Sequence, residues 1–482
     1  MTLDWLHLGT LILAVHVLGI AAACHAIMNT RTSQGAIAWA VSLTAMPYLT
    51  LVPYLFLGRS KFSGYVDARR HETEALRTHT PRARWRDADA TDGPAAEALG
   101  QAAVLALTRL GGMPFVGGNA VRTLVNGEAT FAAILAAIDD ARDYVVVQFF
   151  IVRDDALGRM LRDSLLARAA AGVRCYLLYD SIGSFDLPSS YVDALRKGGV
   201  DVHPFATHRK FVNRFQLNFR NHRKIVVVDG KRAFVGGHNV GVEYLGANAR
   251  LAPWRDTHIE ICGPVVASIQ YVFAEDWHWA TQTLPPMAPA LPAPPDAGDC
   301  SMHCLAVPMG PADKQETGSL FFVEAINAAR ERVWITTPYL IPDEAVIAAL
   351  KLAVMRGVDV RILIPSRRDH YVVFEASKLY ARDLVDAGVR VFRYRPGFLH
   401  QKVVLIDRVA AAVGSANLDN RSFRLNFEIM VLTVDRTFAA EVAAMLDADF
   451  AQAYEVDSNE YRRSPAWRRI AMHVARLFAP IL

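Results

Sequence analysis

The chain has 482 residues and a formal net charge of +4. It is long enough for two or three domains, and its weak net charge does not by itself indicate nucleic-acid binding. Hydrophobic residues make up 52% of it, and the apolar excess lies in the first 60 residues. Five scattered cysteines exclude a disulfide framework and fit a reducing compartment. A zinc site at Cys300, His303 and Cys304 lacks a second ligand pair, so neither a metal nor another cofactor is expected.

Two apolar stretches at the N-terminus, residues 5–28 and 36–58, predict a two-helix transmembrane hairpin. Each exceeds the roughly 20 residues that cross a bilayer core. A cleaved signal peptide is the alternative for the first stretch, but no basic segment precedes it and a second stretch follows at once. Eight Lys and Arg residues lie between positions 59 and 86. Because basic flanks stay in the cytoplasm, we expect a multi-pass protein of the cytoplasmic (inner) membrane with both hairpin ends and the catalytic domains inside.

Composition divides the rest of the chain. A polar stretch, rich in Arg, Ala, Asp and Thr, predicts a cytoplasmic linker with helical segments, and a later proline-rich stretch (LPPMAPALPAPPDA) can be neither a helix interior nor a central strand. The expected segments are the hairpin 1–58, the linker 59–100, a first domain 101–283, a Pro-rich linker 284–300 and a second domain 301–482.

The two domains repeat one order of elements. An apolar run is followed by an aspartate, a helical stretch, a Gly-Val pair and a second strand, with the strands at 144–152 and 174–179 in the first half and at 333–341 and 359–365 in the second. This alternation predicts an α/β fold with mixed sheets flanked by helices. Two tandem copies predict a pseudo-twofold arrangement with a shared site at the seam.

Each half also carries the same polar string at the same spacing. A histidine is followed by Lys two residues later, by Asp five after the Lys, and by Gly and Asn seven and ten after the Asp. The members are His222, Lys224, Asp229, Gly236 and Asn239 in the first half, and His400, Lys402, Asp407, Gly414 and Asn417 in the second.

The residue types suit chemistry on a phosphodiester. Strand positions two apart share a face, so each His and its Lys point the same way. The small residues Gly237 and Ser415 before each Asn let backbone approach an anion. Lysines and the amides of Asn239 and Asn417 can hold the non-bridging oxygens. One histidine would attack phosphorus, while the other protonates the leaving alkoxide and then deprotonates the acceptor.

Both strings resemble the HxKxxxxD motifs of the phospholipase D superfamily, and the whole chain resembles bacterial cardiolipin synthases. Further similar stretches lie at residues 221–230, 254–258, 337–339 and 414–428. The resemblance implies two tandem phospholipase D-like domains behind an N-terminal transmembrane hairpin. A binding protein with degenerate copies would have lost one or more of the six motif positions, and none is substituted.

The roles of the acidic residues stay open. Asp229 and Asp407 lie seven residues after their histidines, an offset that points to the opposite face of a regular strand. We expect them to fix a turn, although the resemblance implies that they are catalytic. Asp256 and Glu428 follow about one strand later and are candidates to bind the far nitrogen of each imidazole. Buried structural acids are the alternative.

The superfamily also contains phospholipases, phosphatidylserine synthases and nucleases, so the motifs do not identify the substrate. Three features favour an anionic membrane lipid: the hairpin, a basic and aromatic insert at 204–221, and an amphipathic C-terminal run at 467–482. The alternatives are a solvated loop for the insert and burial against the domain for the C-terminal run.

The expected reaction transfers a phosphatidyl group between two phosphatidylglycerol molecules through a phosphohistidine, giving cardiolipin and glycerol. Hydrolysis to phosphatidic acid is the first alternative. A nuclease or phosphodiesterase is the second, disfavoured by the absence of an extended basic tract; no nucleic-acid partner is expected. Phosphatidylethanolamine as donor and an oligomeric state both stay possible. The resemblance and the chain order favour His222 as the nucleophile.

Overall fold

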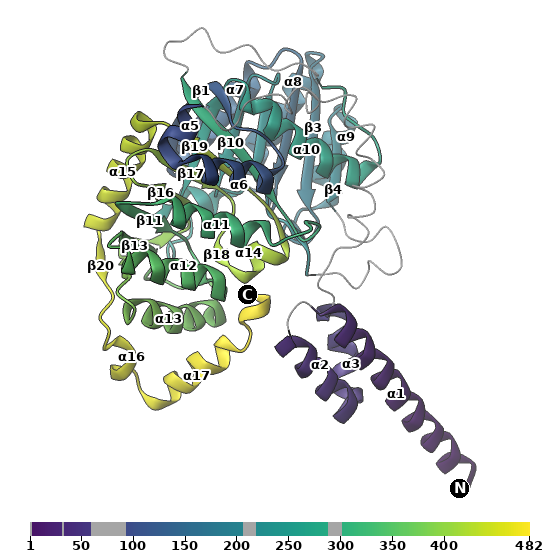
Figure 1. Cartoon of the computed structure of the whole chain (residues 1–482). Helices are drawn as coiled ribbons and strands as arrows, with labels where there is room; N and C mark the ends of the chain where they lie inside the picture. Colours follow the sequence, from purple (N-terminus) through teal and green to yellow (C-terminus); the bar gives the residue numbers. More distant parts are fainter. Residues whose placement is uncertain (1, 31–32, 59–92, 206–217, 288–300) are drawn as a thin grey trace.

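A computed structural model describes residues 2–30, 33–58, 93–205, 218–287 and 301–482. The body is a mixed sheet covered by helices on both faces, and three N-terminal helices project from it (Figure 1). The expected α/β class with two similar halves is therefore confirmed. Most of the linker 59–100, of the Pro-rich linker 284–300 and of the insert at 204–221 lies outside the described residues.

One mixed sheet of 16 strands runs through the described body; 15 strands follow one path, and the sixteenth, β5 (Arg220–Asn221), pairs with β19 beside it. The strands of the first half follow the order β4-β3-β2-β6-β7-β9-β1, and those of the second half β10-β19-β17-β16-β11-β13-β14-β20. In chain order the first set is β1 (Val116–Val125), β2 (Tyr144–Phe149), β3 (Arg174–Asp180), β4 (Asp201–Phe205), β6 (Ile225–Val228), β7 (Arg232–Gly236) and β9 (Thr257–Cys262). The second set is β10 (Met302–Met309), β11 (Arg332–Thr336), β13 (Asp359–Pro365), β14 (Arg390–Tyr394), β16 (Val403–Ile406), β17 (Ala410–Gly414), β19 (Asn426–Val434) and β20 (Ala453–Glu455).

The two halves join edge to edge rather than forming separate sheets. β1 and β10, which open the two halves, pair antiparallel with Val116 opposite Cys304. Because the edge strands of the two halves pair with each other, neither leaves a free strand edge at the seam. The pseudo-twofold arrangement expected from the repeat thus takes the form of a continuous sheet.

Equivalent helices cover the strands in both halves. They are α7 (Asn126–Asp139), α8 (Ala156–Ala170), α9 (Ser189–Lys197) and α10 (Val265–Thr281), matched by α11 (Thr317–Ala328), α12 (Glu344–Met355), α13 (Tyr371–Val385) and α15 (Arg436–Ala451). α8 and α12 begin at capping aspartates, Asp155 and Asp343, whose carboxylates accept from the amides of Gly158 and Val346. The central strand β2 is buried along its whole length, as expected for a strand covered on both faces.

The boundary between linker and first domain differs from the expectation. α5 (Pro94–Leu99), at the end of the expected linker, is a helix with three buried apolar side chains. α6 (Gln101–Gly111), placed by sequence in the first domain, packs against β10 and α11 of the second half. Its buried Val104 and Leu107 make one face apolar, and that face covers the sheet next to the seam.

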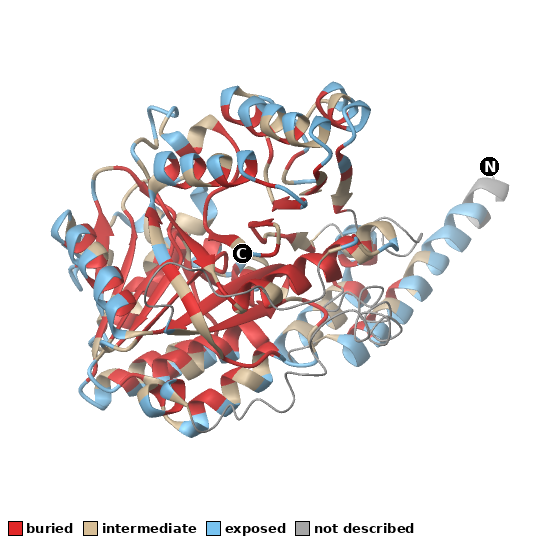
Figure 2. Cartoon of the chain, turned by 90° about the horizontal axis from the view of Figure 1, so that it is seen from above, coloured by how far each residue is buried: buried red, intermediate tan, exposed pale blue. Residues whose placement is uncertain are grey.

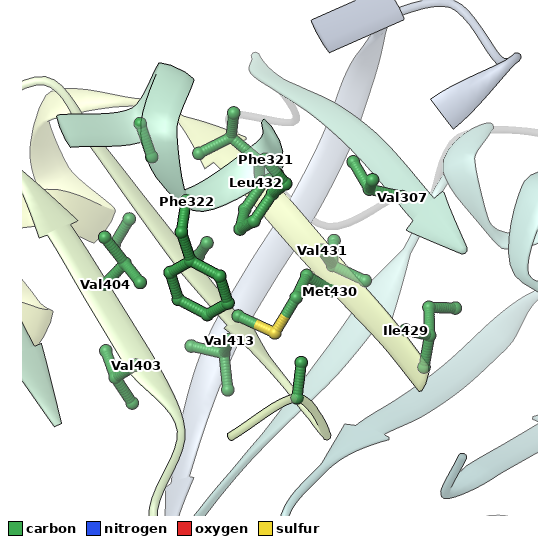
Figure 3. Packing of buried hydrophobic residues seen from close by; sticks show 14 of the residues in the cluster. Val307, Phe321, Phe322, Val403, Val404, Val413, Ile429, Met430, Val431 and Leu432 are labelled. Carbon is green, nitrogen blue, oxygen red and sulfur yellow. The ribbon is translucent and has the colours of Figure 1, made fainter. Parts of the chain in front are cut away.

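Burial is concentrated in the strands and in the inward faces of the helices (Figure 2). In the second half, Phe322 of α11 lies among Val404, Val413 and Met430 of three neighbouring strands (Figure 3). The same core cluster includes side chains from α5, α6 and α10. This core cluster therefore ties the two halves together, and a second cluster lies within the first half.

The N-terminal helices include the first expected span, but the second apolar stretch is not one continuous helix. α1 (Thr2–Asn29) contains the described helical segment that is long and apolar enough to cross a membrane, His7–Asn29. The expected second span is instead two helices, α2 (Ser33–Ala45) and α3 (Pro47–Leu57). The break falls at Met46, because the residue before a proline is disfavoured in the helical region. At 13 and 11 residues, they are about 20 and 16 Å long, short of a bilayer core of about 30 Å.

The C-terminal run forms α16 (Glu460–Arg463), α17 (Ala466–Arg476) and a final 3-10 turn (Ala479–Ile481). Met472 and Ala475 of α17 are buried, and α17 packs on α13, where Arg468 and Arg476 pair with Glu375 and Asp383. The opposite face exposes apolar side chains, namely Trp467, Ile470, Val474, Leu477 and Phe478. The helix therefore packs against the domain and still presents an apolar face outward.

Candidate active site

The two motif histidines lie at corresponding places, just before β6 and β16. Short strands hold them there: β5 (Arg220–Asn221) pairs with β19, and β15 (Phe398–Leu399) pairs with β8 (Trp254–Arg255). The His222 amide donates to the Phe427 carbonyl at 2.9 Å, and the His400 amide donates to the Arg255 carbonyl at 2.7 Å. Each histidine is thus fixed by backbone of the other half.

The carboxylates that serve the imidazoles are also exchanged between the halves. His222 Nδ1 lies 2.9 Å from Glu428 Oε2, and His400 Nδ1 lies 2.7 Å from Asp256 Oδ2. The two acids make the contact expected of them, with the addition that each comes from the half opposite to its histidine. Because each carboxylate accepts a hydrogen bond from Nδ1–H, Nε2 of each neutral ring carries the free lone pair.

Ser415 and Gly237 serve the acids rather than lying free for an anion. The Ser415 hydroxyl donates to Glu428 Oε2 at 2.6 Å, and Ser422 and Asn426 donate to Oε1. A methyl group on Gly237 would lie 2.1 Å from Asp256 Oδ1, so the carboxylate rests directly against this glycine. Both residues therefore support the two carboxylates, while their contact with phosphate stays a prediction.

The two motif asparagines bind neighbouring protein groups. Asn239 donates to the Tyr244 hydroxyl at 2.9 Å and accepts from the Ile151 amide at 3.2 Å. Asn417 donates to Asp419 Oδ2 at 3.2 Å. They hold the loops that follow β7 and β17, while their contact with phosphate stays a prediction.

The motif aspartates lie at the far ends of their strands. Asp229 and Asp407 both adopt positive φ, 52° and 51°, at the turns after β6 and β16. Asp229 accepts from the amides of Arg142, Asp143 and Tyr144, and Asp407 binds the three equivalent amides before and at the start of β11. Each lies seven positions after its histidine, at the other end of a four-residue strand, which in extended backbone is a span of about 23 Å. These contacts support the turn role that the offset indicated over the direct catalytic role that the resemblance implies, and the catalytic role stays a prediction.

Burial and neighbouring charge set the protonation of the site. Burial, with the two lysines adding to it, lowers the pKa of His222 to about 4 against the opposing pull of Glu428. Burial and Lys402 lower the pKa of His400 to about 4, against Asp256. Burial would raise the pKa of Asp256, but His238, Lys402 and His400 outweigh it and hold that pKa well below the usual range. Both histidines are therefore neutral at pH 7 and able to attack.

The two motif lysines are the cationic groups of the site. Nζ of Lys224 and Nζ of Lys402 each donate to the carbonyl of their own motif histidine. Burial, partly offset by the carboxylates, lowers the pKa of Lys224 to about 7 and that of Lys402 to about 8. Bringing an anion between them would reverse the effect, because a negative charge favours the ammonium form.

A second layer of buried polar groups supports each motif and was missed from sequence. Arg223 forms an ion pair at 2.8 Å with Asp276 of α10, and Gln401 donates to Asp449 of α15 at 2.8 Å. Both Arg223 and Gln401 directly follow a motif histidine, which is the signal that could have found them. No spacing in the sequence points to the two helix aspartates.

A family described as "Cardiolipin synthase, PLD-like domain" matches residues 134–277 and 322–450. Cardiolipin synthase A of Pseudomonas aeruginosa is 58% identical over 476 residues, covering 99% of this chain and 96% of that protein. The chain belongs to the cardiolipin synthase family of phospholipase D-like proteins. Cardiolipin synthase A of Pseudomonas putida is 56% identical, with 98% of each chain covered.

Among solved structures, the phosphatidylserine synthase of Haemophilus influenzae Rd KW20 matches with a TM-score of 0.60 at 15% identity. It covers 79% of this chain and 100% of that chain. At this identity the match supports the fold alone. In the described parts of this cardiolipin synthase family member, no group of three or more His, Cys, Asp or Glu side chains is placed to hold a metal ion.

The contact between Gly237 and Asp256 gives a test of the carboxylate's position. We expect Gly237→Ala to lower turnover about 100-fold, because the methyl group must displace the carboxylate that orients His400. The measurement is the initial rate with purified full-length protein in lipid micelles. Gly93→Ala is the matched control, since a methyl group there meets nothing within 4 Å. Near-normal turnover of Gly237→Ala in a folded protein would show that this position of Asp256 is not required.

Proposed function

We propose that this chain is a cardiolipin synthase that transfers a phosphatidyl group from one phosphatidylglycerol to another through a phosphohistidine. The observation that carries the proposal is the crossed pair of imidazole–carboxylate contacts, flanked by two buried lysines. It provides two activated nitrogens and two cations in one site, which is what a two-step displacement at phosphorus requires. The near full-length similarity to cardiolipin synthase A supports the lipid substrate.

In the first step, His222 Nε2 attacks the phosphorus of the donor lipid. The phosphorus–nitrogen bond forms, the bond to the glycerol oxygen breaks, and His400 transfers a proton to the departing glycerol. His400 is neutral in the free protein, so it must gain that proton as the anionic lipid binds and raises its pKa. Glu428 stabilises the positive ring of His222, because it holds Nδ1–H and receives three further hydrogen bonds.

In the second step, the terminal hydroxyl of another phosphatidylglycerol replaces the histidine. His400 takes the hydroxyl proton, the new oxygen–phosphorus bond forms, and the bond to His222 breaks to release cardiolipin. Lys224 and Lys402 stabilise the charge on the non-bridging oxygens in both steps.

Water must be kept from the phosphohistidine for transfer to dominate. Trp254, Phe398 and Tyr244 surround His400 with ring centroids 5.1, 6.0 and 6.5 Å from the imidazole, and Phe150 lies 5.0 Å from His222. These aromatic walls lower water access, and a membrane-bound site raises the local concentration of lipid acceptor.

The N-terminal helices support a membrane location with one crossing helix. Tyr48, at the start of α3, lies 3.1 Å from His16, halfway along α1, and Tyr54 lies 2.7 Å from His25, near its end. α2 therefore runs back along α1 only as far as the middle of α1, and α3 then runs in the same direction as α1. This arrangement supports α1 as the span, α2–α3 as a re-entrant pair, and an inner-membrane protein whose catalytic halves face the cytoplasm with the N-terminus outside. It replaces the expected hairpin with both ends inside.

The orientation can be tested in intact spheroplasts with a membrane-impermeant maleimide. We expect Thr2→Cys to be labelled before lysis and Ser458→Cys, at an exposed site of the body, only after lysis. The unaltered protein gives the background of its own cysteines. Labelling of both positions only after lysis would establish two full crossings.

The nucleophile can be identified by trapping. With radiolabelled phosphatidylglycerol, we expect His400→Ala to retain label on His222, because the missing general base slows the second step. The label is located by peptide mapping after a rapid quench. Label on His400 in the His222→Ala protein, and none in His400→Ala, would reverse the assignment.

Product analysis separates transferase from hydrolase. We expect the full-length protein in phosphatidylglycerol membranes to release glycerol and cardiolipin in about equal amounts, with little phosphatidic acid. Mass spectrometry of the lipids and an enzymatic glycerol assay provide both quantities. If phosphatidic acid is the main product, the protein is a phospholipase D and the synthase assignment fails.

A further inference from the structure

A basic cavity of about 470 Å³ lies at the ends of β13 and β14, on the second half of the body. Its basic lining side chains are Arg250, Arg367, Arg368, Lys378, Arg393 and Arg468. The single acidic side chain among its lining residues is Glu460. This excess of positive charge around a cavity indicates an anionic ligand.

Arg393 of β14 is the strongest sign that the cavity binds an anion. Its side chain is only 3% exposed, and one terminal nitrogen donates to the Pro365 carbonyl at 3.4 Å. Nε and the other terminal nitrogen have no hydrogen-bond partner among the described residues. The carboxylate of Glu460 stays 3.7 Å from Nε. Buried cationic donors without a full set of acceptors are costly, and a phosphate group would supply the acceptors.

Two of the other cations, Arg468 and Lys378, share one carboxylate, that of Glu375. Glu375 accepts from Arg468 at 3.0 Å and lies 3.5 Å from Lys378 Nζ. Burial, together with the charges of Arg468 and Arg393, lowers the pKa of Lys378 despite Glu375. The cluster therefore has more positive charge than its own carboxylates neutralise.

The cavity lies at the same edge of the sheet as the catalytic residues. Arg367 and Arg368 follow β13, and β11 separates β13 from β16, which begins just after Lys402. The backbones of β13 and β14 therefore lie two and three strand spacings, about 10–15 Å, from that of β16. Tyr339 and Asp369, in contact with each other, line a narrow gap that shares Arg367 and Arg393 with the cavity. The charge of Asp369 favours the ammonium form of Lys402, so this gap lies within electrostatic range of the active site.

Contacts of the C-terminal segment relate the cavity to the membrane helices. Arg468 projects from α17, whose outer face is apolar. The carbonyl of Leu482 accepts from the Arg421 amide, and the Arg421 guanidinium donates to the Asn218 carbonyl. Asn218 in turn donates to the Phe56 carbonyl at the end of α3. The segment that lines the cavity thus ends beside the base of the membrane helices, where a lipid headgroup would lie.

We propose that this cavity binds the phosphate group of the second phospholipid, the acceptor whose hydroxyl resolves the phosphohistidine. The inference rests on the proposed transfer reaction and names a site separate from the one that holds the donor phosphate. Arginine suits the task because its planar donors bind two phosphate oxygens at once.

The test measures the two steps separately in full-length protein. We expect Arg393→Gln to raise the phosphatidylglycerol concentration that half-saturates cardiolipin formation about tenfold, as for the loss of one charge-assisted contact. The single-turnover burst of glycerol stays within about twofold of normal, since donor attack does not use the cavity. The share of phosphatidic acid rises, because water gains on a weakly bound acceptor.

A second variant, at exposed residues of the cavity, keeps the test valid if Arg393→Gln fails to fold. Arg250 and Arg368 are exposed, so the double change Arg250→Gln and Arg368→Gln should leave the fold intact and shift the same quantities. Arg159→Gln, at an exposed arginine of α8 that pairs with Asp154, is the matched control and should shift neither. Unchanged acceptor dependence in both cavity variants overturns the proposal, and so does an equal loss of glycerol burst and cardiolipin, which would make the cavity a donor site.

Soluble glycerol 3-phosphate separates a lipid site from a site for free phosphate esters. We expect no competition with phosphatidylglycerol at millimolar concentration. Competition in the unaltered protein that disappears in Arg393→Gln would overturn the lipid assignment. Failure of the proposed function would be recognised differently, because the unaltered protein itself would then make phosphatidic acid in place of cardiolipin.

Discussion

The exchange of carboxylates between the two halves is the contact on which the site depends. Glu428 binds His222 and Asp256 binds His400, each across the seam. A buried imidazole without its carboxylate would lose the fixed tautomer that leaves Nε2 free, and a buried carboxylate without its donors would carry an uncompensated charge. Neither half can therefore form a working or an electrostatically satisfied site alone. The continuous sheet through β1 and β10 holds the halves in the one register that satisfies both pairs.

The pseudo-symmetry is broken where the two acids differ in length. Asp256 is short, and its carboxylate comes so close to the backbone that the facing position is Gly237. Glu428 is one carbon longer, and the equivalent position holds Ser415, whose hydroxyl donates to it. Each half thus holds a carboxylate against an imidazole in its own way: Gly237 leaves room for Asp256, and the Ser415 hydroxyl donates a hydrogen bond to Glu428.

Access for lipid and exclusion of water have a common structural origin. The aromatic rings around His400 and His222 would shield the proposed phosphohistidine from water. The helices α1 and α17 lie on the same side of the body (Figure 1), and α17 exposes apolar side chains. The basic cavity beside α17 extends this arrangement to a second phosphate. A chain that must bring two anionic lipids together gains from separate cationic sites, because each neutralises one phosphate and reduces the repulsion between them.

The sequence by itself determined the α/β class, the duplication and the residues of the two motifs, because strand and helix periodicity and the identical spacing in both halves are local properties. It also indicated the turn role of Asp229 and Asp407 through an offset that no regular strand accommodates on one face. Three things were decided only by tertiary structure. Which acid serves which histidine depends on pairing between strands about 200 residues apart, and no spacing encodes that. The helix α6 joins the second half because its apolar face fits next to the seam. The break of the expected second span at Met46 follows from Pro47, but the direction of α3 after the break depends on its contacts with α1.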